Sequence, residues 1–205
     1  FRNAVLAPLS LIIPPLRKIV IERYSGLVIN PAFRRRPAEG EARRNWLWQG
    51  QPSRWARGKL HGYQMKLDIS GWSNRATYFL ERFYDLPTQY VLMAVLRPGD
   101  LFVDIGANEG MMSLLAASRV GPHGRVIAFE PNPVVAGRLR RNVRQNGFAD
   151  RVRVIQAGLS DQAAHALLYI GTNSTAATLT AGGAQWAKGT DVRLMRLDDV
   201  LDLGD

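Results

Sequence analysis

The pattern of apolar and polar positions is clearest between residues 101 and 156, where short apolar runs alternate with amphipathic stretches. Three runs, Leu101–Ile105, Arg125–Phe129 and Val152–Gln156, have the length and composition of buried strands. The two stretches between them place apolar residues at helical spacing. Because the connections are short, this order predicts a parallel α/β sheet with right-handed crossovers. Ligands of such sheets bind at the carboxyl ends of the strands.

The turn after the first strand, Gly106–Gly110, has the composition of a ligand-binding turn. Its two glycines let a ligand approach the backbone closely. We expect Asn108 to cap the following helix, Glu109 to lie in its first turn, and Gly121 to end it. The positive end of the helix dipole would then point at the turn and favour a ligand's carboxylate or phosphate.

The second helix is expected to begin with Asn132 as its cap and Pro133 at its first position. Apolar residues recur every fourth position along it, and arginines are expected on its outer faces. The pair Asn146-Gly147 closes this helix. The apolar positions are Val135, Leu139 and Val143, and the outer arginines are Arg138, Arg140, Arg141 and Arg144.

An acidic residue, Glu130, follows the second strand, twenty residues beyond Gly110. A carboxylate at this place can accept hydrogen bonds from both hydroxyls of a ribose, which indicates a nucleoside-containing cofactor. Dinucleotide enzymes carry Gly-x-Gly-x-x-Gly in the preceding turn, whereas Gly106-Ala-Asn-Glu-Gly110 lacks the middle glycine. A pyrophosphate is therefore the poorer fit to this turn.

Three sequence blocks resemble the FkbM-type S-adenosylmethionine-dependent methyltransferases: Val103-Asp-Ile-Gly-Ala-Asn-Glu-Gly110, Val126-Ile-Ala-Phe-Glu-Pro-Asn-Pro133 and Arg141-Asn-Val-Arg-Gln-Asn-Gly147. The resemblance runs from about residue 97 to residue 199 and includes Ala157-Gly-Leu-Ser-Asp161. It implies a Rossmann-like class I methyltransferase core with a three-layer parallel sheet. It also implies S-adenosylmethionine as the cofactor and O-methylation of a hydroxyl on a glycan or a secondary metabolite.

The resemblance also implies the cofactor contacts. Asp104 would fix the amino end of the methionine moiety, the glycine turn would wrap its backbone, and Glu130 would hold the ribose. Adenine would be flanked by Pro131 and by the edge that Leu159 and Ser160 form. The implied cofactor-binding residues are Asp104, Gly106, Ala107, Asn108, Gly110, Glu130, Pro131, Leu159 and Ser160. No residue stands out as a catalytic base, and no metal site is expected.

The chain departs from the family pattern in two places. Where the family commonly has an aliphatic residue in the glycine turn, this chain has Glu109, which would help the helix dipole if it faced solvent and repel a carboxylate if it faced the ligand. The family's strand with Lys-Ile-Asp-x-Glu-Gly does not appear before Asp205, so we expect a fragment or a truncated product with an incomplete sheet. A degenerate cofactor-binding module without catalysis stays open as an alternative. An NAD-dependent oxidoreductase is disfavoured by the missing middle glycine.

Positive charge is concentrated in the first half of the chain. The net charge is +10, of which +9 belongs to residues 1–100. Such a segment could bind nucleic acid, anionic lipid or acidic glycans. Scattered, solvated arginines are the favoured interpretation, so nucleic acid is disfavoured as a partner and a small-molecule or glycan acceptor is expected. Cysteine is absent, which excludes disulfides and thiolate metal sites. A cytoplasmic location is expected, and the oligomeric state is left open.

The chain is expected to divide into a basic accessory segment with an irregular linker, residues 1–85, and a partial methyltransferase domain, residues 86–205. Ala4–Ile13 is apolar but too short to span a bilayer, so a helix packed on its own domain or on a partner is favoured over weak contact with a membrane surface. Residues 31–59 are rich in breakers and are expected to form a linker or irregular loop. The remaining expected elements are strands at 63–69, 167–170 and 192–194, a helix at 88–96, and a hairpin or flap at 171–189.

Overall fold

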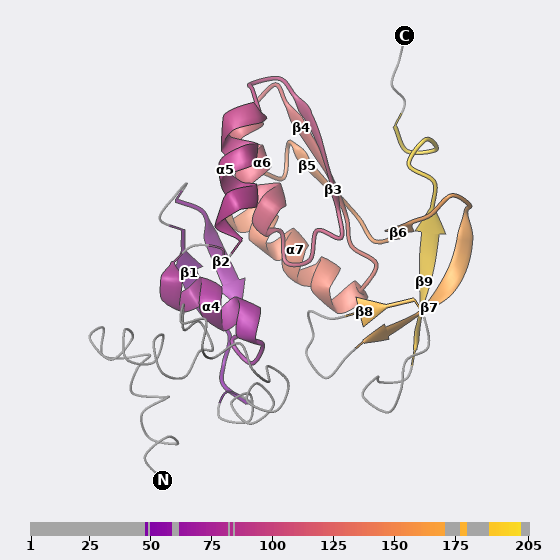
Figure 1. Ribbon diagram of the computed structural model, residues 1–205, viewed down its shortest axis with the longest axis horizontal. Helices are drawn as coiled ribbons and strands as arrows, with labels where there is room; N and C mark the ends of the chain where they lie inside the picture. The colour runs from indigo at the N-terminus through magenta and orange to yellow at the C-terminus, as the bar shows by residue number, and fades with distance from the viewer. Residues whose placement is uncertain are drawn as a thin grey trace. The chain divides into compact units, whose positions relative to one another are not determined.

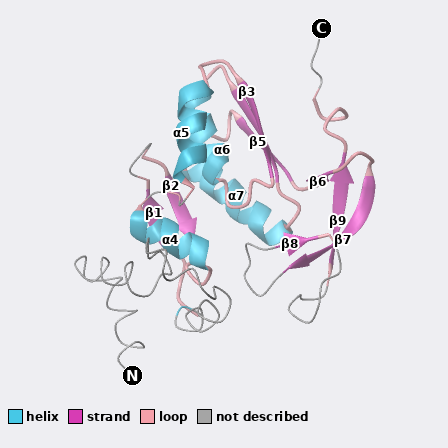
Figure 2. Ribbon diagram, viewed as in Figure 1, coloured by secondary structure: helices cyan, strands magenta, loops and turns pink. Residues whose placement is uncertain are grey.

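The computed structural model describes residue 48 and residues 50–58, 62–81, 83, 85–170, 177–179 and 189–201. The chain divides into two compact units, Phe1–Leu86 and Pro87–Asp205, and each is described by itself. The apolar segment predicted at Ala4–Ile13 and most of the loop predicted at 31–59 lie outside the described residues. Figure 2 distinguishes the helices, strands and loops of the described part.

The core of the second unit is a parallel sheet of consecutive strands. β3 (Leu101–Ile105), β4 (Arg125–Phe129) and β5 (Val152–Ile155) pair in the order β3-β4-β5. α6 (Met111–Val120) connects the first two strands and α7 (Pro133–Gln145) connects the next two. Figure 1 shows both helices on the same side of the sheet. This arrangement confirms the predicted Rossmann-like α/β core.

Local sequence explains where α7 begins. The Asn132 side chain accepts hydrogen bonds from the backbone amides of Val134 and Val135, at 3.0 and 3.4 Å, which satisfies donors that a helix start leaves unpaired. Pro133 occupies the first helical position, where its missing amide costs nothing. The predicted cap and first position of α7 are therefore confirmed.

The start of α6 corrects the prediction. Gly110, with φ +97°, occupies the N-cap position without a side-chain hydrogen bond, and the helix begins at Met111. Asn108 is therefore not the cap, and Glu109 precedes the helix instead of lying in its first turn. The predicted end is confirmed, because Gly121 is the C-cap, with φ +68°.

The two faces of the parallel sheet differ in burial. The face that carries Val126 and Ala128 is covered by α6 and α7, and both side chains are fully buried. On the other face of β3, Leu101 is 44% and Ile105 is 63% exposed. Side chains alternate along a strand, so the helix-covered face of β3 also carries Asp104.

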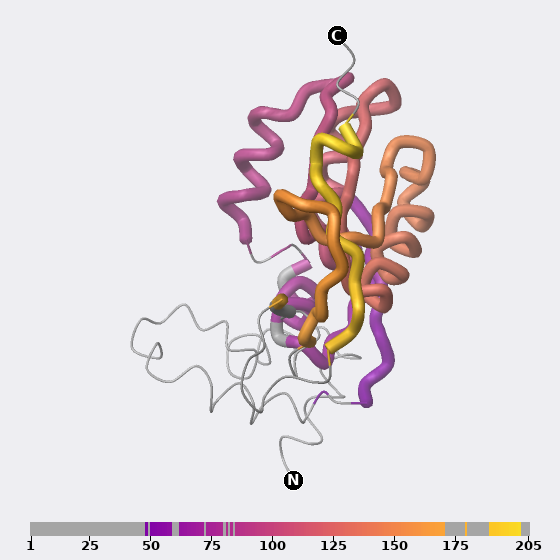
Figure 3. Tube along the Cα trace, turned by 90° about the vertical axis from the view of Figure 1, so that its right-hand side faces the viewer, coloured from indigo at the N-terminus to yellow at the C-terminus, as the bar shows by residue number. Residues whose placement is uncertain are grey.

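Short strands follow β5 and form a second sheet. β6 (Gly158–Leu159) pairs in parallel with β9 (Thr190–Met195), which pairs antiparallel with β7 (Ala164–Ile170). β8 (Ala177–Thr178) pairs with the end of β7, and the rest of the flap predicted at 171–189 lies outside the described residues apart from 179 and 189. Figure 3 shows β7 and β9 running side by side. The strands predicted at 167–170 and 192–194 are confirmed and are longer than predicted.

α5 (Leu86–Val95) begins where the two units divide and leads into β3. It confirms the helix predicted at 88–96. The Arg119 guanidinium, near the end of α6, donates a hydrogen bond of 3.0 Å to the Met93 carbonyl of α5. The Gly99 amide, in the turn before β3, donates to the carbonyl of Val120, which fixes that turn against the end of α6.

The described part of the first unit is a hairpin followed by a helix. β1 (Arg54–Arg57) pairs antiparallel with β2 (Gln64–Leu67), and α4 (Trp72–Leu80) follows. β1 corrects the expectation of a loop through residue 59, while β2 falls within the strand predicted at 63–69. Buried Arg75 donates to the carbonyls of Ile69 and Ser70. The core side chains here are Trp48, Met65, Leu67, Ile69, Ala76 and Phe79.

Within the described part of the chain, none of the helices is both long enough and apolar enough to cross a membrane.

Candidate ligand-binding site

The candidate site is built at the carboxyl ends of β3 and β4. β3 ends at Ile105 and delivers the turn Gly106–Gly110, while β4 ends at Phe129 and delivers Glu130. The two strands are in register, with Ile105 opposite Phe129, so the turn and Glu130 emerge side by side. This is the place where parallel α/β sheets bind their ligands.

The backbone of the turn bends sharply and is anchored to the end of β4. Gly106, Asn108 and Gly110 have φ angles of +76°, +50° and +97°, a region that favours glycine and tolerates asparagine. The amides of Gly106 and Ala107 both donate to the Phe129 carbonyl, at 3.0 and 2.9 Å. These amides are therefore occupied by the protein, and the turn offers less of an anion cradle than its helix-start position predicts.

Asp104 is the first carboxylate of the site. It lies on the helix-covered face of β3, and its Oδ2 accepts a hydrogen bond of 2.5 Å from the Ser113 hydroxyl of α6. Burial raises the pKa of the Asp104 carboxyl, while hydrogen bonds from the side chain and backbone of Ser113 lower it. Ser113 is fully buried, so it fixes the orientation of the Asp104 carboxylate.

Glu130 is the second carboxylate, and it is 8% exposed. Its Oε2 accepts from the Asn108 amide at 3.0 Å, and its Oε1 accepts from the Asn132 amide at 2.9 Å. Burial raises the pKa of Glu130; the two amide hydrogen bonds lower it, and the charge of Asp104 raises it. Each carboxylate oxygen has a second lone pair, so Glu130 can hold the turn and still accept hydrogen bonds from a ligand.

The electrostatics of the site favour a cationic ligand. Two carboxylates with raised pKa values lie at neighbouring strand ends, and the charge of Asp104 acts on Glu130. A positive charge nearby would stabilise both ionised forms, whereas a phosphate would add to the repulsion. Open space surrounds the position of a Cβ added at Gly106, so a ligand can approach the backbone there.

Glu109 does not face solvent, which corrects one of the two alternatives derived from the sequence, and its carboxylate is directed to α7. Its side chain is 5% exposed, and its Oε1 lies 2.8 Å from Nη1 of Arg138 in α7. Its backbone carbonyl accepts a hydrogen bond of 2.9 Å from the Asn142 side chain. Arg138 was expected on the outer faces of α7 with three other arginines, and this ion pair corrects that expectation.

The residues predicted to flank adenine lie along one edge. Pro131 follows Glu130, and a Cβ added at Gly158 would lie 3.9 Å from Pro131 Cβ, so the start of β6 is next to this proline. Leu159 belongs to β6, and the Ser160 amide donates to the Met195 carbonyl of β9. Pro131, Leu159 and Ser160 are all partly exposed, and their contact with adenine stays a prediction.

Sequence reasoning missed Ser113, Arg138 and Asn142, which hold the site from the helices. Ser113 is a polar residue on the apolar side of α6, and Asn142 is a polar residue on the buried side of α7. A buried polar side chain needs a hydrogen-bond partner, so these two positions carried a usable signal. Arg138 carried none, because three neighbouring arginines on the same helix look the same in the sequence.

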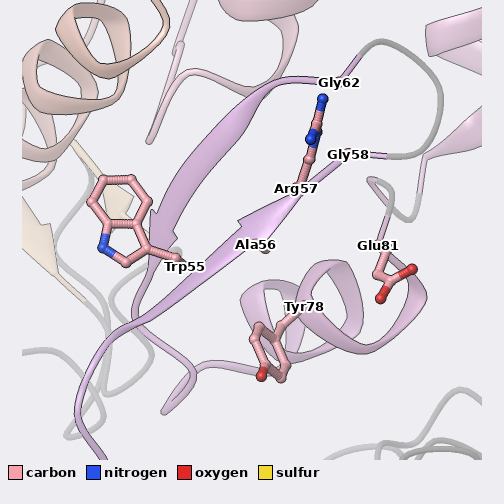
Figure 4. Close-up of a pocket in the computed structure, with 7 residues that line it drawn as sticks. All are labelled: Trp55, Ala56, Arg57, Gly58, Gly62, Tyr78 and Glu81. Atoms are coloured by element: carbon pink, nitrogen blue, oxygen red, sulfur yellow. The ribbon is translucent and has the colours of Figure 1, made fainter. Parts of the chain in front are cut away.

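A hollow of about 600 Å³ lies in the first unit, between β1 and α4. Figure 4 shows Trp55, Arg57 and Tyr78 at its border, with the Arg57 side chain directed away from the Tyr78 ring. These side chains do not converge on one point. The hollow therefore has a lining with aromatic and charged groups, but not the convergent polar groups of a binding site.

Comparison with known proteins identifies the second unit. The family model described as the methyltransferase FkbM domain matches residues 104–204. The 31-O-demethyl-FK506 methyltransferase FkbM of Streptomyces tacrolimicus is 37% identical over 119 residues, which cover 51% of this chain and 45% of that protein. The methyltransferase sdnD of Sordaria araneosa is 36% identical over 85 residues, or 42% of this chain and 30% of that protein. The chain thus spans less than half the length of these two relatives.

Among solved structures, a SAM-dependent O-methyltransferase of Thermotoga maritima is 27% identical, with a TM-score of 0.34, and covers 36% of this chain and 28% of that one. The match to the family model begins at Asp104, at the end of β3, and includes the glycine turn, Glu130 and both helices that hold them. Residues 104–204 of the chain therefore match the FkbM methyltransferase domain, the family that the three sequence blocks resemble.

Proposed function

We propose that this chain is the cofactor-binding part of an S-adenosylmethionine-dependent methyltransferase. The observation that supports it is the pair of carboxylates, Asp104 and Glu130, beside a tightly bent glycine turn at the end of a parallel sheet. S-adenosylmethionine presents an ammonium group, a sulfonium and a ribose diol. Its positive groups would offset the charge of the two carboxylates, and its hydroxyls are donors for Glu130.

The hydrogen bonds of the glycine turn and the charge of Asp104 favour this cofactor over a dinucleotide. The pyrophosphate of NAD needs free backbone amides at the glycine turn, and the Gly106 and Ala107 amides are already bonded to the Phe129 carbonyl. Asp104 would also repel an anion placed beside the turn. Glu130 alone would suit either cofactor, so the occupied amides and the second carboxylate make the distinction.

In this proposal the protein binds and orients the methyl donor. Asp104 holds the ammonium group, the turn from Gly106 to Gly110 follows the methionine backbone, and Glu130 accepts from the ribose. Pro131, Leu159 and Ser160 border adenine. The bound cofactor supplies a methyl group already activated by its sulfonium. The protein therefore has to align donor and acceptor and exclude water.

We propose a hydroxyl group of a glycan or a secondary metabolite as the methyl acceptor. One relative is named for an O-demethyl substrate, which supports an oxygen acceptor. The described residues offer no group at the site that we assign as a base for the hydroxyl proton. A cofactor-binding module without catalysis is therefore the second candidate, and the release of S-adenosylhomocysteine with hydroxyl acceptors would distinguish the two.

Calorimetric titration of S-adenosylmethionine into the full chain tests the proposal. We expect the unsubstituted protein to bind and Glu130→Ala to bind at least about tenfold more weakly, because a charge-assisted hydrogen bond is lost. Asp150→Ala is the matched control, since it removes the same charge from an exposed position outside the site. Its affinity should be unchanged.

The outcomes separate the candidates. Binding of NADH in place of S-adenosylmethionine would support the oxidoreductase, and binding of neither would overturn the cofactor assignment. Equal affinities for the unsubstituted protein and Glu130→Ala would remove Glu130 from the site. Circular dichroism of each variant checks that its helices and strands are retained.

A further inference from the structure

The glycine turn is held from outside by α7. Glu109 of the turn forms an ion pair of 2.8 Å with Arg138, and the Glu109 carbonyl accepts from the Asn142 side chain at 2.9 Å. Arg138 and Asn142 are four positions apart in a helix, so they lie on the same face of α7. One face of α7 therefore makes two bonds to a single residue of the turn.

These two bonds stabilise a turn whose backbone includes left-handed residues. Asn108, with φ +50°, is in the left-handed region, which asparagine tolerates but most other non-glycine residues avoid, and it precedes Glu109 directly. The inner side of the turn is bonded to the Phe129 carbonyl and to Glu130, and the outer side is bonded to α7. The turn is thus fixed between the end of β4 and α7.

The ion pair also controls charge beside the site. Glu109 is a third acidic residue, next in the chain to Asn108, whose amide donates to Glu130, and the pKa values of Asp104 and Glu130 are already raised. The Arg138 guanidinium faces Glu109 at hydrogen-bond distance and neutralises that charge. In the proposed site, Asp104 and Glu130 are then the carboxylates that contact the ligand, while Glu109 pairs with Arg138.

We infer that Glu109 and Arg138 are positioning residues that hold the cofactor-binding turn in its ligand-competent conformation. Arg138 has no predicted contact with the cofactor, yet it sets the affinity through the geometry of the turn and through the charge that it neutralises. The inference rests on the proposed function, because it concerns the same turn. A purely structural pair would change the stability of the fold but not the affinity of the folded protein.

The test is calorimetric titration of S-adenosylmethionine into the Arg138→Gln variant of this chain, at a temperature where thermal unfolding curves show the variant to be folded. We expect affinity to fall about tenfold, the size of a typical coupling between neighbouring sites. Arg144→Gln is the matched control, because Arg144 is an exposed arginine of the same helix. Its affinity should stay within about twofold of the unsubstituted protein.

Further variants keep the test decisive if Arg138→Gln fails to fold. In Glu109→Gln the amide oxygen still accepts a hydrogen bond from Arg138. The Arg138 side chain is 23% exposed, so water can solvate its charge in this variant. We expect affinity to fall about threefold in this variant, and the double variant to lose no more than Arg138→Gln alone. An additive loss in the double variant, or unchanged affinity in both single variants, would overturn the inference.

Failure of the inference and failure of the proposed function look different. If the unsubstituted protein binds and the position-138 and position-109 variants bind equally well, only the inference fails. If the unsubstituted protein does not bind, the proposed function fails, and hydrogen exchange without ligand decides the inference. Arg138→Gln should then speed exchange of the amides from Ala107 to Gly110, and unchanged exchange there would overturn the positioning role.

Discussion

At the residue scale, Glu130 joins the two sides of the candidate site. Its two oxygens accept from the Asn108 amide in the turn and from the Asn132 amide at the start of α7. A substitution at this residue would therefore disturb the turn as well as any ligand contact. Glu130→Gln is the milder variant, because an amide oxygen can still accept one of these bonds.

We expect Glu130 to make stability fall as pH rises. Burial raises the pKa of Glu130 in the folded chain, so the folded state holds its proton at pH values where the unfolded state has lost it. The contribution to stability is present below the ordinary carboxyl pKa and is lost as pH rises through the raised value. Relative to Glu130→Gln, the melting temperature should drop by about 2 °C or more between about pH 4 and about pH 7.

Melting curves of the unsubstituted protein and Glu130→Gln, recorded over this pH range, measure that difference. Asp150→Asn is the control, because the side-chain hydrogen bond from Arg151 lowers the pKa of Asp150. Its contribution has the opposite sign, with stability present above the ordinary pKa and lost as pH falls. A melting-temperature difference for Glu130→Gln that does not change with pH would contradict the prediction.

The sequence identified the residues of the site that face a ligand better than those that support them. Asp104, Glu130 and the glycines follow strands directly, and strand ends can be read from apolar runs. Arg138 and Glu109 are 29 positions apart and meet only because α7 packs beside the turn. No local pattern specifies such a contact, so it could not be predicted from one sequence.

At the scale of elements, boundaries set by local chemistry were predictable and boundaries set by packing were not. β3, β4 and the start of α7 coincide with their predicted bounds, since apolar runs and an Asn-Pro cap define them. α6 begins two residues later than a cap at Asn108 would place it. The turn is drawn toward β4 and α7 by tertiary bonds, and these override the capping preference of asparagine.

Two glycines in neighbouring elements should respond oppositely to substitution by alanine. At Gly110 the new Cβ would overlap Leu139 of α7, and φ is +97°, so Gly110→Ala should cost roughly 1–3 kcal/mol. Gly137 is inside α7 and has open space around its Cβ position, so Gly137→Ala should stabilise by about 0.5–1 kcal/mol.

Chemical denaturation of both variants measures these free energies of unfolding. Gly137→Ala serves as the control, because it makes the same chemical change in a helix where neither contact nor φ opposes it. A neutral Gly110→Ala would mean that the turn and Leu139 can separate without cost. That result would also weaken the case for a tightly held turn.

At the scale of the whole molecule, the chain contains two compact units, and every candidate site residue lies in the second. We propose residues 1–85 and 86–205 as the corresponding domains. The first unit was the harder one to predict. Its strand β1 lies in a stretch with glycine and proline nearby, and its alternation covers only Arg54–Arg57. A pattern of four residues is too short to separate a strand from a loop.

Hydrogen exchange with and without S-adenosylmethionine should show a change in the second unit and none in the first. The cofactor should slow exchange in peptides covering residues 104–113 and 128–132, because it adds bonds to the turn and to the end of β4. Peptides covering β2 and α4 should be unchanged. Protection of β2 or α4 would contradict this and would place part of the first unit in contact with the ligand.

The Glu109–Arg138 pair also constrains how this sequence can diverge. Loss of Arg138 alone removes this counter-ion from a Glu109 side chain that is 5% exposed, a change that we expect to cost more than replacing both residues together. Related sequences that replace this ion pair by two apolar residues would therefore change both positions together, or would first have glutamine at one of them. Positions 109 and 138 should accordingly vary together among sequences that share this turn.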